Sequence, residues 1–233
     1  MPRPRRIPFT NERGRGAAAP KEGSALAWQN NTAELRGTLE GPPELSHISR
    51  GMEYYSVTLS TRRLSGTRDR ANVILPRSLL PCLPEPGEKL WLRGELRSFN
   101  NRSGSGSRLV LYIFGQEAAP AEDPGEDKNE VALTGALCKP PIWRRTPMGR
   151  EICDLMLAVN RRYGRSDYLP CIAWGKNAQA ASLWEVGTGV SLLGRFQSRG
   201  YVKTTDSGES LEKTAYEVSV TAFLPPEPDP AAL

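Results

Sequence analysis

Aromatic and basic side chains follow one another between Cys171 and Arg199, in the second half of this 233-residue chain. Trp174 ends a short apolar segment, and Arg195 and Arg199 flank the end of a later one. A ring at the end of a strand can stack on a nucleobase, and arginines can meet the phosphates beside it. These residue types in this order predict a surface that holds a strand of nucleic acid.

The elements that would position these residues follow from the same stretch. Cys171–Trp174 is apolar and is closed by Gly175, which predicts a strand. Residues 177–184 are rich in helix formers, and Gly187 and Gly189 interrupt the pattern. Residues 190–197 then resume as a strand. We therefore expect a strand, a short helix, a tight turn and a second strand.

Other aromatic residues extend this candidate site. Tyr163 lies in a polar, arginine-rich loop, and Tyr201 lies between Arg199 and Lys203, so both are expected to bind rather than to pack in a core. Tyr168 and Trp174 lie inside strands, where packing in a barrel wall is an equal alternative on the residues alone. Trp143 precedes two arginines at the expected tip of a hairpin, where it provides either a further base platform or a contact with another subunit.

Basic residues cluster in the loops beside these aromatics. Their clustering, rather than their number, indicates phosphate contacts, since most surface charges are merely solvated. The candidates in the second half are Arg144, Arg145, Arg161, Arg162, Arg165, Lys176, Arg195, Arg199 and Lys203. In the first half, Phe99 and the following flexible loop with Arg102 offer one further platform.

The composition of the chain limits which classes of function are expected. Charged residues make up 24% of the chain, the formal charge is +5 and the isoelectric point is about 9.1, which permits a polyanionic partner without requiring one. No apolar run is long enough to span a bilayer, and no signal peptide is apparent, so we expect a soluble, cytoplasmic protein with reduced cysteines. Four cysteines without a CxxC pair and one histidine, His47, argue against a zinc site.

An internal repeat divides the chain into two copies. Seven identities recur 98 residues apart without a gap: Asn31, Gly37, Leu39, Pro42, Pro43, Gly51 and Glu53 match Asn129, Gly135, Leu137, Pro140, Pro141, Gly149 and Glu151. Farther on, Gly87, Gly94 and Ser98 recur 100 residues later. The chain is therefore predicted to hold two copies of one domain, residues 30–116 and 129–224, the first divergent. A disordered basic arm (1–29), an acidic linker (117–128) and a disordered tail (225–233) complete it.

Each copy is predicted to contain five strands. In the second copy these are residues 130–138, 151–160, 168–174, 190–197 and 216–223, with the hairpin turn at 140–149 and the helix at 177–184. In the first they are 32–40, 53–61, 71–75, 89–96 and 108–114, and prolines shorten the helix to a turn at 78–83. This order predicts an all-β chain of two tandem OB-folds, each a five-stranded Greek-key barrel with a short helix between strands three and four.

The second copy resembles the bacterial single-stranded DNA-binding protein family over about 95 residues. The resemblance rests on segments spread over the whole copy: Asn129–Gly135, Thr146–Gly149, Leu157–Asn160, Cys171–Lys176, Gly187, Gly194–Arg199, Tyr201 and Tyr216–Val218. The family's base-stacking positions fall on Tyr163, Tyr168, Trp174 and Tyr201, all aromatic here. The first copy is related mainly through the repeat, and it has no aromatic residue at the position of Trp174.

The resemblance implies sequence-independent binding of single-stranded DNA in replication, recombination or repair, without catalysis or cofactor. One branch of the family carries two OB-folds per chain and dimerises to present four, which implies a homodimer here. The family often ends in an acidic tip closed by an aromatic residue, which recruits replication proteins. The last residues here, Asp229–Leu233, lack that tip, which puts such recruitment in doubt.

Alternatives remain open. An OB-fold adaptor of a primosome or a plasmid replication system would act mainly through protein contacts, with the first copy contacting protein. RNA is a possible ligand, because stacking does not select the sugar. An enzyme is the weakest class, since no phosphate-binding glycine loop, carboxylate pair or metal cluster is found.

Overall fold

A computed structural model of the chain describes residues 30–225 apart from 81, 102–106, 122–124, 162–163 and 205–209. The predicted basic arm lies outside the described residues, as does all but the first residue of the predicted tail. Half one consists of β1 Asn31–Leu39, β2 Glu44–Ser49, β3 Met52–Arg62, β4 Arg68–Pro76, the 3₁₀ helix η1 Arg77–Leu79, β5 Lys89–Asn100 and β6 Leu109–Pro120. Half two consists of β7 Lys128–Leu137, β8 Ile142–Arg145, β9 Glu151–Asn160, β10 Ser166–Trp174, α1 Lys176–Ala181, β11 Gly189–Thr204 and β12 Ser210–Leu224.

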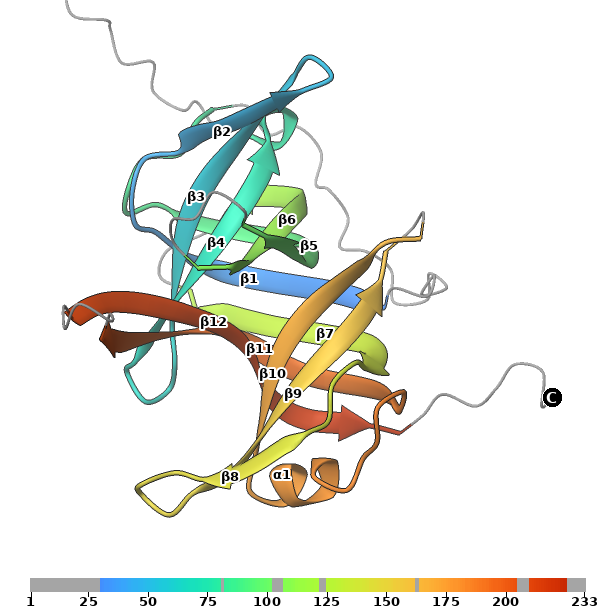
Figure 1. The fold of residues 1–233 in the computed structure, drawn as a ribbon. Coiled ribbons are helices and arrows are strands. Elements are labelled where there is room, and N and C mark those ends of the chain that lie inside the picture. The colour runs from blue at the N-terminus through green and yellow to red at the C-terminus, as the bar shows by residue number, and fades with distance from the viewer. Residues whose placement is uncertain are drawn as a thin grey trace, which may run out of the picture.

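Each half closes into a ring of five strands. In half one the pairings run β1–β3–β4–β6–β5 and return to β1, and in half two they run β7–β9–β10–β12–β11 and return to β7. Both rings contain one parallel pair, β4 with β6 and β10 with β12. Strands β2 and β8 are added at the edges, each on one neighbour only. Figure 1 shows the two rings one above the other, with β1 and β7 side by side between them.

The alternation of the sequence explains the closed rings. Every second residue of β1 is buried, from Asn31 to Leu39, and the same alternation recurs in β4 and β5. The buried faces supply one leucine- and valine-rich core inside each ring, with Leu35, Leu59 and Leu92 in half one and Leu133, Leu157 and Phe196 in half two. Helix α1 contributes Ala178 and Ala181 to the second core and lies at the end of half two away from half one (Figure 1).

A pseudo-twofold relation joins the halves. β1 and β7 are antiparallel, and Ala33 faces Val131, its equivalent 98 residues later in the chain. Asn31 exchanges two hydrogen bonds with the backbone of Leu96, and Asn129 does the same with Phe196. The repeated asparagines thus bind the same strand position in both halves, which gives the repeat a structural reason.

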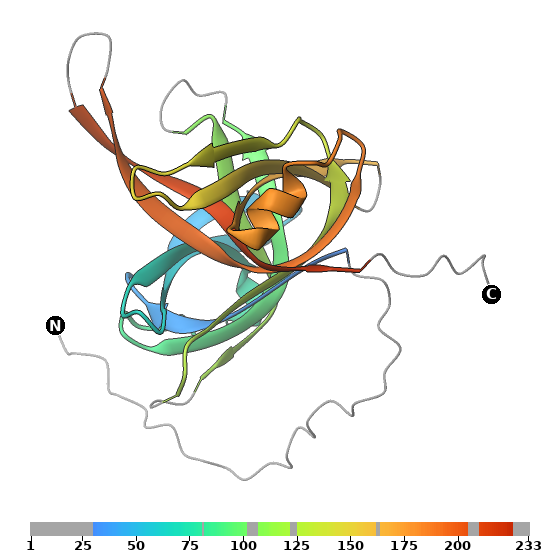
Figure 2. The same cartoon turned by 90° about the horizontal axis from the view of Figure 1, so that it is seen from below.

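The ring strands lie where the sequence predicted them, but several bounds were wrong. The expected hairpin turn at 140–149 contains β8, so Trp143 lies within a strand rather than at the tip. The last two strands of half two were predicted to end at residue 197 and to begin at residue 216, but β11 and β12 pair as far as Thr204 and Ser210 and form an arm beyond the ring (Figure 2). The α-helix ends at Ala181 instead of residue 184, and half one has only η1 in its place. The predicted linker at 117–128 is shorter in the structure, because β6 extends to Pro120 and β7 begins at Lys128.

Within the described part of the chain, no helix has the length and apolarity needed to cross a membrane.

Candidate nucleic-acid interface

Three predicted aromatics share the outer face of half two, which is the face of its ring that points away from the core. Tyr168 and Trp174 are separated by six residues in β10, so both point outward while Leu169 and Ala173 point to the core. Tyr201 lies in β11 on the side opposite the buried Phe196. The side chains of Tyr168, Trp174 and Tyr201 are 49%, 36% and 37% exposed. Their rings are therefore available to a ligand rather than packed in the barrel.

Trp174 is fixed at one edge and open at its face. Its indole Nε1 donates a hydrogen bond to Ser219 Oγ of β12, with 3.2 Å between the two atoms. Gly175, with φ of 52°, then turns the chain into α1, a conformation that a side chain would disfavour. Fixing the ring in this way lowers the entropy lost when a base stacks on it.

The arginines of β8 are committed to carboxylates of the same hairpin. Arg144 Nε lies 2.6 Å from Asp154 Oδ2, and Arg145 lies 3.1 Å from Glu151 and over the ring of Trp143. The hydrogen bond to Asp154 raises the pKa of Arg144. A phosphate would have to compete with these carboxylates, so both arginines are weaker candidates than the sequence suggested. Trp143 itself is 45% exposed.

Arg161 and Arg195 lie at the boundary between the halves. Arg161 binds the fully buried Asp167 through two nitrogens and donates to the carbonyl of Ser98, and the bond to Asp167 raises its pKa. Burial and the nearby Arg63 lower the pKa of Arg195, but its guanidinium group stays positively charged. Arg161 therefore joins the two halves, and Arg195 Nε lies 3.7 Å from Asp69 of half one, so both arginines are less available to a phosphate.

Arg199 and Lys176 are the predicted cations best placed for phosphates. Both are exposed, and neither forms an ion pair with another described residue. Arg199 lies in β11 two residues from Tyr201, and Lys176 begins α1 two residues after Trp174. Two of the three exposed rings, Trp174 and Tyr201, therefore have a cation nearby in the sequence. Tyr163, Arg162, Arg102 and the side chain of Lys203 lie outside the described residues, so their predicted roles remain predictions.

Half one carries the predicted platform Phe99 and further aromatic residues. Phe99 is 48% exposed and meets Tyr112 of β6 edge to face at 6.0 Å. Tyr54 of β3 lies 6.0 Å from Phe114 of β6 and stacks on His47 of β2 at 4.7 Å. None of these rings lies on β4, the strand equivalent to β10, where Pro76 occupies the position equivalent to Trp174. Tyr112 and Phe114 were not predicted, and the signal that could have found them is the alternation in β6, where they flank the buried Ile113.

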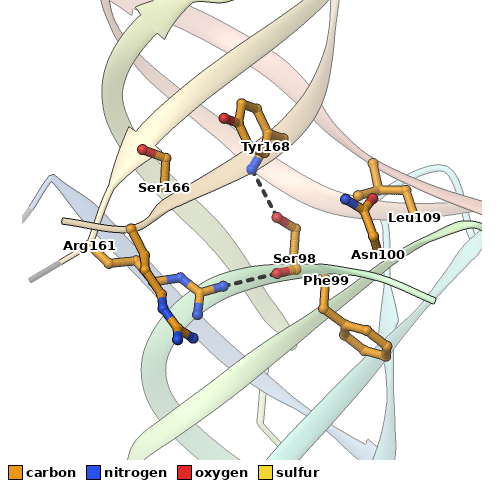
Figure 3. Close-up of a pocket in the computed structure, with 8 residues that line it drawn as sticks. Ser98, Phe99, Asn100, Leu109, Arg161, Ser166 and Tyr168 are labelled. Atoms are coloured by element: carbon orange, nitrogen blue, oxygen red, sulfur yellow. Dashed lines mark hydrogen bonds between the residues drawn. The ribbon is translucent and has the colours of Figure 1, made fainter. Parts of the chain in front are cut away.

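A cavity opens where the two halves meet (Figure 3). Its volume is about 320 Å³, and its lining comes from β5, β6 and the segment from Arg161 into β10: Ser98, Phe99, Asn100, Leu109, Arg161, Arg165, Ser166 and Tyr168. The backbone N–H of Tyr168 donates to Ser98 Oγ at 2.8 Å, and Figure 3 shows Ser98 between the Tyr168 and Phe99 side chains. Two predicted platforms from different halves, Tyr168 and Phe99, thus border one cavity.

Metal and thiol chemistry find little support in the described residues. No cluster of three histidine, cysteine or carboxylate side chains there could hold a metal ion. All four cysteines are free: Cys153 and Cys171 are buried, Cys138 is partly buried and Cys82 is exposed. Burial raises the pKa of Cys153 and of Cys171, so these thiols stay protonated.

Comparisons with known proteins identify sequence relatives of half two. The pattern of the Single-strand binding protein family matches residues 128–224. Single-stranded DNA-binding protein B of Bacillus subtilis is 32% identical over 107 residues, which are 43% of this chain and 93% of that protein. Single-stranded DNA-binding protein 2 of Listeria innocua is 32% identical over 105 residues, which are 42% of this chain and 65% of that protein, slightly less than two thirds of its length.

A solved structure extends the likeness beyond half two. The wild-type single-stranded DNA binding protein from Thermus aquaticus has a TM-score of 0.68 to this chain and 24% identity, and the match covers 86% of this chain and 94% of that one. This likeness establishes the all-β fold. The matches to the Bacillus and Listeria proteins establish the sequence relationship over half two.

Proposed function

We propose, from the premise that this chain belongs to the single-strand binding protein family, that it binds single-stranded DNA without sequence preference. Bases would stack on Tyr168, Trp174 and Tyr201, and phosphates would meet Arg199 and Lys176. The observation that carries the proposal is that these three rings are exposed on the outer face of half two, where Arg199 and Lys176 are exposed too and form no ion pair with another described residue. Stacking on a ring tolerates any base, which fits binding without sequence preference.

The relatives support single-stranded DNA as the ligand, since the Bacillus and Listeria proteins are named for binding it. Members of the family are DNA-binding proteins rather than enzymes, so no reaction is assigned to the chain. Covering unwound DNA in the bacterial cytoplasm during replication, recombination or repair is the role we propose for it. In this role we propose replication proteins as its protein partners.

Two tandem OB-folds, residues 30–116 and 129–224, are the proposed domain organisation. The two five-stranded rings, the edge strands β2 and β8 at equivalent positions, and the 86% coverage of the Thermus protein support it. The OB-fold closes a short Greek-key barrel and leaves one outer face to bind an extended strand. The second fold, with its three exposed rings on β10 and β11, is proposed as the main binding site.

A protein-contact role for half one has one observation in its favour. The hairpin of β2 and β3 exposes Leu45, Ile48 and Met52, whose side chains are 54%, 63% and 43% exposed. An apolar edge of this kind favours a protein neighbour. We propose that it supports a homodimer with four OB-folds, or contact with a replication protein. Sedimentation of the wild type and an Ile48→Glu variant tests the dimer, which the charge should dissociate.

Tryptophan fluorescence tests the proposed binding directly. Titration with poly(dT) at moderate salt should quench emission, because a base stacked on Trp174 quenches its indole, whereas duplex DNA should have little effect. A Trp174→Phe variant keeps a ring for stacking and should retain binding while losing most of the quenching. Absence of binding to poly(dT) would leave the protein-contact role as the better explanation of the fold.

A further inference from the structure

Two equivalent seams join the halves, and the same hydrogen bonds build both. At one, Asp167 of β10 accepts the backbone N–H of Ser98 at 2.5 Å, and Ser98 Oγ accepts the N–H of Tyr168. At the other, Asp69 of β4 accepts the N–H of Ser198 at 3.2 Å, and Ser198 Oγ accepts the N–H of Arg70 at 2.9 Å. Asp69 and Asp167 are equivalent in the repeat, as are Ser98 and Ser198. The seams therefore began as copies of one arrangement.

The exposed residues at the two seams differ in chemistry. Tyr168 of one seam corresponds to Arg70 of the other, and Phe99 corresponds to Arg199, by the same repeat offsets. We call the first the aromatic seam (Ser98, Phe99, Asp167, Tyr168) and the second the arginine seam (Asp69, Arg70, Ser198, Arg199). Arg70 is paired with Glu40 at 2.8 Å, so part of the charge at the arginine seam is neutralised. Only the aromatic seam presents rings at both positions.

The aromatic seam also has space for a ligand. Its cavity of about 320 Å³ lies within the range of small-ligand pockets, ~300–1,000 Å³. Phe99 and Tyr168 are each about half exposed on it. Arg161 is held by Asp167, whereas the exposed Arg165 at the rim can meet a phosphate. An aromatic wall with a cation at its rim suits one nucleotide, base inward and phosphate outward.

The cavity connects two aromatic surfaces. On one side lies Tyr168, which is on the outer face of half two together with Trp174 at the end of the same strand, β10. On the other, Phe99 contacts Tyr112, beside the Phe114 and Tyr54 pair. Ser98 and Asp167 hold the two walls at a fixed separation, so the path between these surfaces is already formed.

We infer that the aromatic seam is a nucleotide-binding subsite through which one continuous single strand passes from half two to half one. The inference rests on the proposed function and adds to it the path of the strand. Half one then binds DNA through Phe99 and the rings beside it, although Pro76 stands where half two has Trp174. A strand that crosses here occupies both halves, so a long oligonucleotide depends on Phe99, whereas a short one can bind to half two alone.

Phe99→Leu separates this crossing from binding to half two. Leucine keeps apolar contact with Tyr112 but removes the stacking ring, and Phe99→Trp restores a ring. Fluorescently labelled dT oligomers of about 12 and about 30 nucleotides serve as probes, because one OB-fold covers ~4–16 nucleotides. For Phe99→Leu we expect about tenfold weaker affinity for the long oligomer and a clearly smaller loss for the short one, which can bind along β10 and β11 without entering half one. Phe99→Trp should bind both as the wild type does.

Arg70→Leu at the arginine seam is the matched control, and it should leave the ratio of the two affinities unchanged. Thermal unfolding verifies that each variant is folded. Wild-type affinity of Phe99→Leu for the long oligomer would overturn the inference, as would a length-dependent loss in Arg70→Leu. If the wild type binds neither oligomer, the proposed function itself fails. As a second readout, a long oligomer with 5-bromodeoxyuridine should cross-link to the peptide that contains Phe99.

Discussion

The carboxylate of Asp167 in β10 accepts the backbone N–H of Ser98 in β5, so a buried acid of half two binds the backbone of half one, with 2.5 Å between the two atoms. The same carboxylate binds Arg161 of its own half and Arg97 of the other. Asp69 and Ser198 repeat the contact in the opposite direction. Two reciprocal locks therefore fix how the halves are oriented, and through this orientation the spacing of the aromatic platforms.

Asp167→Ala should destabilise the whole chain by roughly 3 kcal/mol, because it removes the buried carboxylate that pairs with Arg161 and Arg97 and that accepts the N–H of Ser98. Denaturant unfolding monitored by circular dichroism measures the change. Arg145→Ala is the control, since its exposed pair with Glu151 is worth less than about 1 kcal/mol. Equal losses for the two variants would show that Asp167 is not a structural lock.

Gly135→Ala should destabilise half two by about 1–3 kcal/mol. A Cβ at Gly135 would lie 2.5 Å from the carbonyl oxygen of Ala158 in β9, where β7 and β9 close the ring. The backbone there cannot move without breaking the ring. Gly189→Ala is the matched control, because no atom lies within 4 Å of a Cβ at that position. Thermal unfolding of the two variants compares them, and a stable Gly135→Ala would mean that the ring can open at this point.

Much of the fold could be predicted from the sequence because the repeat and the alternation of buried residues are local signals. The five ring strands of each half were located in this way. The long pairing of β11 with β12 was missed, since residues 203–213 carry charges of both signs and Gly208 instead of an alternation of apolar residues. Backbone pairing, rather than burial, continues those strands.

The site was predicted in part. Exposure of Tyr168, Trp174 and Tyr201 agrees with their expected availability, whereas the sequence could not show that Arg144 and Arg145 are paired with carboxylates across a hairpin. The locks at the seams were missed, although Arg63, Gly66 and Asp69 match Arg161, Gly164 and Asp167 at the repeat offset of 98 residues. Side-chain pairing depends on three-dimensional proximity, which composition and spacing do not give.

The four cysteines should differ in reactivity towards iodoacetamide at pH 8. Burial raises the pKa of Cys171 and Cys153, so little thiolate is present, and burial also raises the pKa of Cys138. The exposed Cys82 should be labelled first and Cys138 next, with labelling of Cys138 increasing as the pH rises towards its pKa. Mass spectrometry of digests locates the labels, and all four should react in denaturant. Native labelling of Cys171 as fast as Cys82 would contradict the buried core.

Arg199→Ala should reduce the salt dependence of single-strand binding. Each phosphate contact to a single strand contributes about 0.7 to the slope of log K against log salt concentration, so the slope should fall by up to about 0.7. Arg144→Ala should change it less, because Arg144 is paired with Asp154 at 2.6 Å. Titrations at several salt concentrations measure both slopes. An unchanged slope in Arg199→Ala would remove this residue from the set of phosphate contacts.

Trp174→Ala combined with Tyr201→Ala should weaken binding of a short dT oligomer far more than Phe99→Ala does. Each lost stack costs ~1–3 kcal/mol, and both rings lie on the outer face of half two, whereas Phe99 belongs to half one. Leu183→Ala is the control for the surface near α1, since Leu183 is 83% exposed and has no assigned contact with DNA. Fluorescence anisotropy with labelled dT measures all four proteins. Equal losses in the double variant and in Phe99→Ala would show that half two is not the main site, and that its exposed rings do not distinguish it from half one.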